Sequence, residues 1–348
     1  MARLGQLKLA MGTSIFLVAF IFAAFLALIM FIIDLPFTYS LIIVILFPIM
    51  FILFQYLIGP AIVRASTHLR YLEPGENPWL ETTVKELANK SGIPMPKLAI
   101  VPDSTPNAFV FGRTSSTATL AVHEGLLRNL NENEVKGVIG HELGHLKHKD
   151  YIIMTILAAL PLIAYLIARG TWQAAWISGG RRQKDEGSMR AALFIIGIAS
   201  YVVYIISLLF VMRLSRLREH YADAYSAYIT ESPRSLESAL AKIAYGLSLS
   251  QKAPSGARAF YIEDPAMAKE EIQEIIEKKE EYDLNKDGVL DERELELAME
   301  KEAKSTWSAI NGWFSTHPPT FRRILLLHEI ETEMESGKYT GERVYAHV

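Results

Sequence analysis

Four stretches without a charged side chain dominate this sequence. They cover residues 9–33, 35–63, 151–168 and 191–212, and a helix needs roughly 20 apolar residues to cross a bilayer. The first stretch is too long for the apolar core of a signal peptide, so we expect it to remain as an anchor. The third stretch is shorter and contains Pro161, so a re-entrant or buried helix stays open beside a crossing one.

The composition agrees with a chain that meets lipid, and it limits the chemistry. Hydrophobic residues make up 51% of the 348 residues and charged residues 21%, which is too apolar for an ordinary soluble or disordered chain. A formal net charge of −3 provides no basic excess for binding nucleic acid. Because the chain has no cysteine, it has neither disulfides nor thiolate sites, and any metal must be held by histidines and carboxylates.

Lysines and arginines near the ends of these stretches indicate their orientation. Arg3 and Lys8 precede the first stretch, and Arg64 and Arg70 follow the second, so both flanking regions are expected in the cytoplasm. Residues 169–190 resist this assignment, because they carry five lysines and arginines and would lie outside. Either this loop departs from the rule, or the third and fourth stretches form a hairpin that does not fully cross.

Cap residues and apolar periodicity predict the elements of the more polar regions. Asn77 followed by Pro78 predicts the start of an amphipathic helix that runs to Lys90. Asn131 and Glu134 have the spacing of a capping box and predict a second helix, which leads with little interruption to the third stretch. Short strands are predicted over residues 97–101, 107–111 and 117–122.

The second predicted helix carries the sequence His141-Glu142-Leu143-Gly144-His145, which has the pattern H-E-x-x-H. At 3.6 residues per turn the two imidazoles point the same way, about 6 Å apart along the axis, and suit one zinc ion. Glu142 lies about 100° round the helix, where it can reach a metal-bound water as a general base. Two solvated histidines on a polar face are the alternative, which the apolar flanking residues disfavour.

A catalytic zinc needs a third protein ligand and an open position for water. We predict Glu219 as this ligand, because Asp223 follows one helical turn later and can hydrogen-bond a ligand histidine. A surface ion pair of Glu219 with Arg216 or Arg218 is the alternative.

Three other histidines are rival ligands. His148 shares the stripe of His141 but lies two turns along the helix, about 10 Å away, which is too far for one metal. His220 points about 100° away from Glu219. His123 is the third rival and follows the last predicted strand.

With these motifs the sequence resembles the HtpX-type membrane zinc metalloproteases, which are related to the CAAX prenyl endopeptidases. The resemblance covers most of the chain: two amino-terminal spans, Asn107-Ala108-Phe109, residues 140–145, a second apolar pair, residues 218–223, and Thr316-His317-Pro318-Pro319 with Arg322. It implies that His141, His145 and Glu219 bind zinc and that Glu142 activates water. It also implies that residues 107–111 form an edge strand that pairs with an extended substrate.

Zinc chemistry then implies the reaction. Zinc lowers the pKa of its bound water toward about 7, Glu142 takes the proton, and it later returns this proton to the leaving amine. A second electrophile for the oxyanion is expected, and His317 and Tyr221 are the candidates. A turn residue ahead of two prolines is an equal alternative for His317. Arg322 is predicted to be a structural partner of Asp223.

Residues 283–294 match the EF-hand calcium loop at every ligand position, with Gly288 at the sharp turn and helices expected on both sides. The predicted Ca²⁺ ligands are Asp283, Asn285, Asp287, the Val289 carbonyl, Asp291 and Glu294. A charged, solvated helix hairpin is the alternative, and Mg²⁺ is a rival ion. Because EF-hands usually pair, a single loop implies low affinity or a partner copy in a homodimer. HtpX-type sequences do not ordinarily contain this loop, so it is either a calcium switch or a static brace.

These features together predict a mostly α-helical integral membrane protein. It has two transmembrane hairpins and an α+β catalytic domain of zincin type with a small antiparallel sheet. The predicted segments are the first hairpin, the first catalytic part, the second hairpin, the second catalytic part, the EF-hand-like insertion and the last catalytic part, over residues 1–63, 64–150, 151–212, 213–262, 263–304 and 305–348.

The leading functional hypothesis is a zinc endopeptidase of the cell membrane that cleaves misfolded or membrane proteins at the cytoplasmic face. Its expected partners are polypeptide substrates and the lipid bilayer. A CAAX-type processing peptidase with a narrow substrate is the rival enzyme. The rival from another class is a calcium-responsive membrane adaptor with a structural zinc site, which would have no need of Glu142 as a base.

Overall fold

The structure is a computed structural model. It describes residues 2–32, 37–177, 186–248, 262, 268–269, 272–273, 275, 277–284, 294, 297–298, 315–337, 339 and 343–348. The chain forms two compact units, each built from separate segments. One unit comprises Met1–Gly5, Pro60–Tyr151 and Ser215–Val348, and the other comprises Gln6–Gly59 and Ile152–Leu214.

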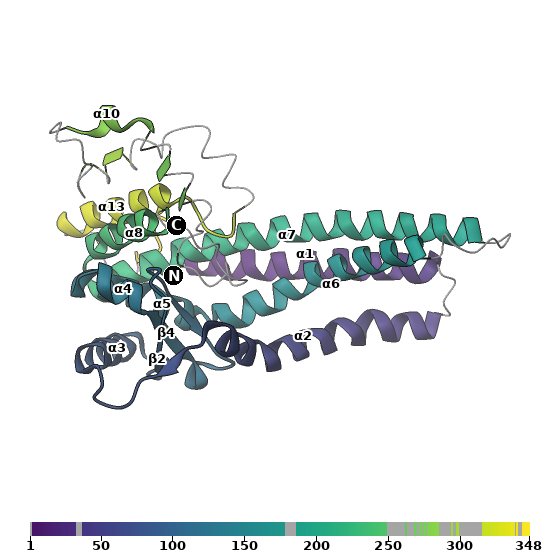
Figure 1. Cartoon of the computed structure of the whole chain (residues 1–348), viewed down its shortest axis with the longest axis horizontal. Helices are drawn as coiled ribbons and strands as arrows, with labels where there is room; N and C mark the ends of the chain where they lie inside the picture. The colour runs from purple at the N-terminus through teal and green to yellow at the C-terminus, as the bar shows by residue number, and fades with distance from the viewer. Residues whose placement is uncertain are drawn as a thin grey trace. The chain divides into compact units, whose positions relative to one another are not determined.

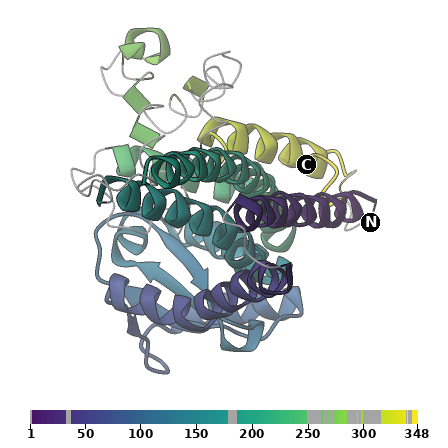
Figure 2. The same ribbon diagram turned by 90° about the vertical axis from the view of Figure 1, so that its right-hand side faces the viewer.

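Long apolar helices make up the second unit. They belong to α1 (Ala2–Ile32), α2 (Phe37–Thr67), α6 (Asp150–Ile177) and α7 (Glu186–Thr230). Among the described residues these four helices are long and apolar enough to cross a membrane, by length and composition. α6 continues through Pro161 without interruption. The views of Figures 1 and 2 agree that α1, α6 and the amino-terminal part of α7 lie side by side.

Aromatic and aliphatic side chains of the second unit divide between a packed interior and an exposed surface. Phe22 of α1, Ile163 of α6 and Ile196 of α7 belong to one buried cluster. By contrast, Phe31 is 81% exposed and Phe54 of α2 is 58% exposed. Large apolar side chains that face outward along an apolar helix are typical of a surface that meets lipid.

A four-stranded sheet lies in the first unit, with the strand order β1-β2-β4-β3. The strands are β1 (Arg70–Tyr71), β2 (Lys97–Val101), β3 (Ala108–Phe111) and β4 (Thr119–His123). β4 is parallel to β2, whereas the β1–β2 and β3–β4 pairs are antiparallel. The small sheet is therefore mixed and not wholly antiparallel as predicted, because the hairpin of β3 and β4 places β4 beside β2 and parallel to it. β3 is at an edge of the described sheet.

Helices and short turns complete this unit. They are α3 (Pro78–Ser91), η1 (Ser115–Thr117), α4 (Glu124–Asn129), α5 (Glu132–His148), α8 (Pro233–Ser248), α10 (Lys279–Tyr282) and α13 (Thr320–Glu335). Both predicted helix starts are confirmed. The Asn77 side chain accepts from the Leu80 N–H at 3.1 Å, and Asn131 and Glu134 form the capping box through bonds of 3.0 and 2.8 Å.

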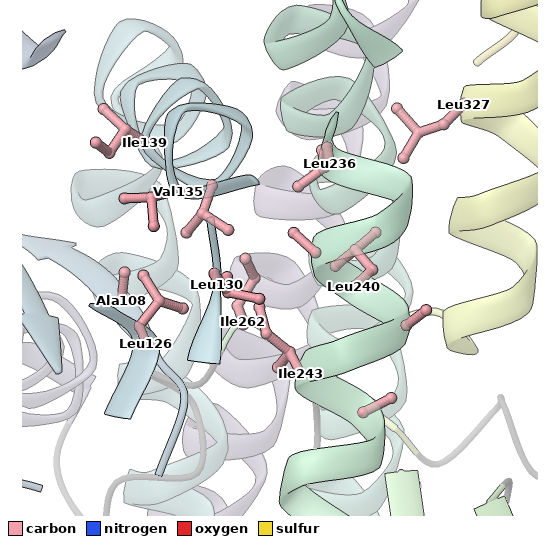
Figure 3. Close-up of a cluster of buried hydrophobic side chains, with 14 of the residues drawn as sticks. Ala108, Leu126, Leu130, Val135, Ile139, Leu236, Leu240, Ile243, Ile262 and Leu327 are labelled. Atoms are coloured by element: carbon pink, nitrogen blue, oxygen red, sulfur yellow. The ribbon is translucent and has the colours of Figure 1, made fainter. Parts of the chain in front are cut away.

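Both faces of the sheet are covered by apolar side chains. Leu98, Leu120 and Val122 lie in the large core with α5, α8 and α13, whereas Phe109 and Ala121 lie in a small cluster on the other face. Figure 3 shows the large core, where Ile139 of α5, Leu240 of α8 and Leu327 of α13 belong to the same cluster. α5 therefore lies between the sheet and the carboxy-terminal helices, which holds its histidines in a fixed environment.

Candidate metal centre

Two glycines of α5 allow the carboxy-terminal part of α7 to approach closely. A Cβ atom at Gly140 would lie 2.8 Å from Ser226 Oγ, and one at Gly144 would lie 3.1 Å from Ala222 Cα. Ser226 Oγ also donates to the Gly137 carbonyl at 2.6 Å. Because the helix backbones meet here, the residues of α7 one turn away, including Glu219, come within reach of the histidines of α5.

The structure brings His141, His145 and Glu219 together. Their ligand atoms all lie within 4.8 Å of one another. His141 Nε2 is 3.0 Å from His145 Nε2, and each of these nitrogens is 3.4 Å from an oxygen of Glu219. In a tetrahedral zinc site with bonds of about 2.0–2.1 Å, neighbouring ligand atoms are about 3.3 Å apart. The three side chains therefore match the donor set and the spacing of a zinc site.

Two carboxylates determine which imidazole nitrogens face this centre. His141 Nδ1 is 2.8 Å from Asp223 Oδ1, and His145 Nδ1 is 2.6 Å from Asp150 Oδ2. Each Nδ1 therefore carries a proton and donates a hydrogen bond to its carboxylate. The two Nε2 lone pairs then point toward each other and toward Glu219. Three acceptors that converge in this way, with His141 and Glu219 buried, form an environment that favours a cation.

Each of these aspartates pairs with an arginine. Arg323 of α13 donates to both oxygens of Asp223, at 2.9 and 2.7 Å, and Arg218 of α7 pairs with Asp150. The prediction that Arg322 is the partner of Asp223 was wrong by one position. Adjacent residues of a helix point about 100° apart, and α13 turns Arg323 inward and leaves Arg322 exposed.

Sequence reasoning missed Asp150 and Arg323. Asp150 stands five residues after His145, directly after Lys149, whose φ of 60° ends α5. An aspartate just beyond a helix that ends in a ligand histidine is a local signal that points to this role. For Arg323 the only available signal was its place in an Arg-Arg pair near two prolines.

Burial shifts the pKa values of the side chains of α5. It raises the pKa of Glu142 to about 8, with a further contribution from the Glu219 carboxylate. Burial also lowers the pKa of His145 to about 3. Burial disfavours a proton on His141 as well, but Asp223 and Glu219 outweigh it and raise the pKa of His141 to about 9. The same negative surroundings that attract a proton attract a metal ion.

The two candidates for a second electrophile lie in different surroundings. His317 is buried, and its Nε2 is 4.0 Å from Glu219 Oε1, while its Nδ1 is 3.0 Å from Thr316 Oγ1. The ring of Tyr221 lies in an aromatic cluster, 4.9 Å from the ring of Tyr345 and 6.4 Å from that of His148. His317 is thus beside the predicted ligands, whereas the role of Tyr221 stays a prediction.

The rival ligands lie outside the group of His141, His145 and Glu219. His148 Nε2 is 2.8 Å from the Tyr345 hydroxyl. His123 is buried in β4 with its Nδ1 3.3 Å from Thr105 Oγ1, and burial lowers its pKa to about 4. His220 is not part of this group either. The Asp223 carboxylate, on the same helix α7, lies near it.

The structure describes all three predicted substrate residues but only part of the predicted calcium loop. Asn107, directly before β3, and Ala108, its first residue, are 1% exposed, and Phe109 is 4% exposed. Of the calcium loop, Asn285, Asp287, Val289 and Asp291 lie outside the described residues. Asp283 and Glu294 are described, and the Leu284 N–H donates to Glu294 Oε1 at 2.8 Å.

A second group in the described part of the chain has donor atoms within 4.8 Å of one another, namely Glu237, His328 and Glu331. It differs from the first group because His328 is exposed and Glu331 is half-buried. In the first group His141 and Glu219 are both buried, beside the equally buried Glu142.

A His-Glu helix whose third metal ligand is a glutamate from a second helix is the arrangement of the zincin class of metallohydrolases. Comparison with known proteins gives the family. The model of Peptidase family M48 matches residues 74–331, and the chain belongs to this family. It is therefore a metalloprotease.

Relatives of this chain include a protein named "Protease HtpX homolog" from Methanothermobacter thermautotrophicus, which is 40% identical over 57% of this chain and 71% of the relative. A protein of the same name from Moorella thermoacetica is 31% identical over 82% of each chain. The crystal structure of S. mikatae Ste24p matches with a TM-score of 0.47 and 16% identity, over 91% of this chain and 62% of that chain. The family and the four apolar helices together make this chain a membrane metalloprotease.

Proposed function

We propose that this chain is a zinc endopeptidase that hydrolyses peptide bonds of misfolded or membrane proteins at the cytoplasmic face of the cell membrane. The observation that carries the proposal is the convergence of two imidazole nitrogens and the Glu219 carboxylate within 3.4 Å. A buried acid, Glu142, stands beside them. A structural site has no need of such an acid, which argues against the adaptor.

Each residue of the site has a separate role in the proposed reaction. His141, His145 and Glu219 would hold a zinc ion, which would supply the Lewis acidity that polarises a scissile carbonyl and acidifies water. Glu142 accepts the proton of the attacking water and delivers it to the leaving amine. His317 donates to the oxyanion, because its Nε2 lies on the Glu219 side of the centre.

The edge strand supports a polypeptide substrate. Among the described strands β3 has a neighbour on one side only, β4, so its other edge can pair with an extended chain. The backbone of Val110 in β3 is hydrogen-bonded to Glu142. A peptide along β3 would therefore pass close to the general base, and pairing through the main chain favours unfolded substrates of many sequences over a narrow processing site.

The charge pattern supports the cytoplasmic location. Arg3, Lys8, Arg64 and Arg70 flank the first two apolar stretches. His145 and Glu219 stand only a few residues from the third and fourth stretches along the chain. Membrane proteins and partly unfolded chains are the substrates that this arrangement favours.

The test is cleavage of an unfolded model protein by the detergent-purified full chain, compared with Glu142→Gln. Zinc content is measured in both. The proposal expects Glu142→Gln to lose about 10²–10⁴-fold in rate at unchanged zinc content. Equal cleavage by both would refute the assigned base. No cleavage by either would favour a narrow CAAX-type peptidase or the adaptor.

The calcium loop forms a further part of the proposal. Glu294 is 3% exposed and accepts from the Leu284 N–H, which brings the last ligand position of the loop close to the start of the loop, where Asp283 is the first predicted ligand. We expect one Ca²⁺ per chain. Cleavage measured against buffered free calcium tests for a switch, with Glu294→Gln as the matched variant. A flat response in the native chain would leave only a bracing role, and sedimentation with and without calcium tests a homodimer.

A further inference from the structure

Ile262 lies far from the predicted metal ligands in the sequence, yet its side chain, its N–H and its carbonyl all contact other segments. Ile262 is 2% exposed, and its side chain lies in the large core (Figure 3). Its backbone N–H donates to Asn107 Oδ1 at 3.0 Å. Its carbonyl accepts from Arg323 at 2.6 Å. Both polar groups of one peptide residue are thus bound by side chains that belong to other segments.

Asn107 connects Ile262 to the edge strand. Its own carbonyl accepts from the His123 N–H at 2.9 Å, which places it at the end of the β3–β4 ladder. Its side chain, however, is buried and accepts from Ile262. An amide that is 1% exposed does not reach a peptide lying along the outer edge of β3.

Arg323 connects the same residue to the metal centre. Its guanidinium donates to the Ile262 carbonyl and to both oxygens of Asp223, and its terminal nitrogen lies 3.4 Å from His141 Nδ1. Asp223 in turn fixes the ring of His141. Because a guanidinium is planar, its donors have a fixed geometry, and a shift of the Ile262 carbonyl would rotate the group that orients Asp223.

We propose that Asn107 and Arg323 are positioning residues that act through the backbone of Ile262, and that this clasp sets the edge strand and the ring of His141 in register. Asn107 therefore positions β3 and does not bind substrate itself. The inference rests on the proposed role of His141 as a ligand.

A double-mutant cycle in the full, zinc-loaded chain tests the proposal. Asn107→Ala removes the acceptor for the Ile262 N–H, and Arg323→Lys keeps the charge but loses the fork that reaches the Ile262 carbonyl. We expect kcat/KM to fall about 10-fold and about 100-fold respectively, and the double variant to resemble Arg323→Lys alone. Independent effects would instead multiply to about 1,000-fold, which would overturn the clasp.

Ser238→Ala is the matched control. Ser238 is buried and donates to Glu134 at 2.7 Å, so its loss removes a hydrogen bond of the same unit that does not involve Ile262. Its effect should multiply with that of Arg323→Lys. If it is as non-additive as Asn107→Ala, the coupling reflects general loosening and the proposal fails.

Hydrogen exchange gives a readout besides activity. Asn107→Ala should speed exchange of the Ile262 amide at least 10-fold while the amides of α5 stay protected, and zinc affinity by chelator competition should fall about 10-fold in Arg323→Lys. Unchanged exchange at Ile262 would overturn the proposal. If Glu142→Gln proves fully active, the proposed base fails, yet the exchange result still decides whether the clasp exists.

Discussion

The two predicted ligand histidines are supported in the same way but from different parts of the chain. In each case the imidazole Nδ1 meets an aspartate that pairs with an arginine. For His141 the aspartate comes from α7 and the arginine from α13, and all three side chains are 0% exposed. For His145 the aspartate is Asp150, only five residues along the chain, and the imidazole is 19% exposed.

This difference shows that the proposed metal site would depend on both long-range and local structure. The aspartate and arginine that orient His141 come together only when α5, α7 and α13 have packed, so binding of zinc there would be coupled to the complete fold. The support of His145 depends on the end of α5 at Lys149, where the chain turns and directs Asp150 back toward the imidazole. Removing Asp223, which orients His141, should therefore lower the free energy of unfolding more than removing Asp150, which orients His145.

Removing the buried aspartate that orients His141 should have the largest effect on stability and zinc affinity. Asp223→Ala leaves Arg323 buried without its carboxylate partner, which costs about 3–5 kcal/mol of unfolding free energy. Zinc affinity should also fall about 10–100-fold, because the ring of His141 loses its orientation. Thermal unfolding and chelator competition measure the two effects. A loss of affinity without a loss of stability would contradict the idea that this support is part of the core.

Widening the gap between the helices should weaken both supports together. Gly144→Ala places a Cβ atom 3.1 Å from the Ala222 backbone, which costs about 1–3 kcal/mol through overpacking. Glu219 would move away from both imidazoles, so zinc affinity falls along with stability. Calorimetry and zinc titration check this. Gly170→Ala is the control, since a Cβ atom there has nothing within 4 Å.

Weakening the contact between Asp150 and His145 should change metal binding more than stability. Asp150→Asn keeps the size of the side chain but removes the charge that orients His145 and pairs with Arg218. We expect about a 10-fold loss of zinc affinity and a smaller drop in melting temperature than for Asp223→Ala. The comparison of the two supports fails if Asp150→Asn destabilises the chain as much as Asp223→Ala does.

The smallest effect is expected at the neighbouring arginine. Arg322 is exposed on α13, so Arg322→Ala should change stability by less than about 0.5 kcal/mol and leave zinc affinity unaltered. Arg323→Ala should reproduce the loss seen for Asp223→Ala. Equal effects of the two arginine variants in unfolding experiments would mean that α13 is rotated from the observed position.

Local signals in the sequence predicted much of this site. The caps at Asn77 and Asn131 fixed two helix starts, and the four-residue spacing of His141 and His145 placed both imidazoles on one face of α5. Asp223 was expected near a ligand histidine because it follows Glu219 by one turn. Each of these features depends on residues that are close together along the chain.

Features that depend on packing between distant segments were not predictable. The parallel pairing of β2 with β4 follows from where a hairpin docks, which periodicity does not specify. The choice between Arg322 and Arg323 depends on the rotation of α13 against α7. The binding of Ile262 by Asn107 joins residues 155 positions apart, and no local pattern marks it.

X-ray absorption at the zinc edge of the purified full chain tests the central claim most directly. The account predicts one zinc ion with two imidazole ligands and the remaining ligands oxygen, and the same spectrum for Glu142→Gln. Glu219→Ala should lose a ligand or the metal itself. Three imidazoles around the zinc, or a spectrum that changes with Glu142→Gln but not with Glu219→Ala, would contradict the assignment of His141, His145 and Glu219 as the metal ligands.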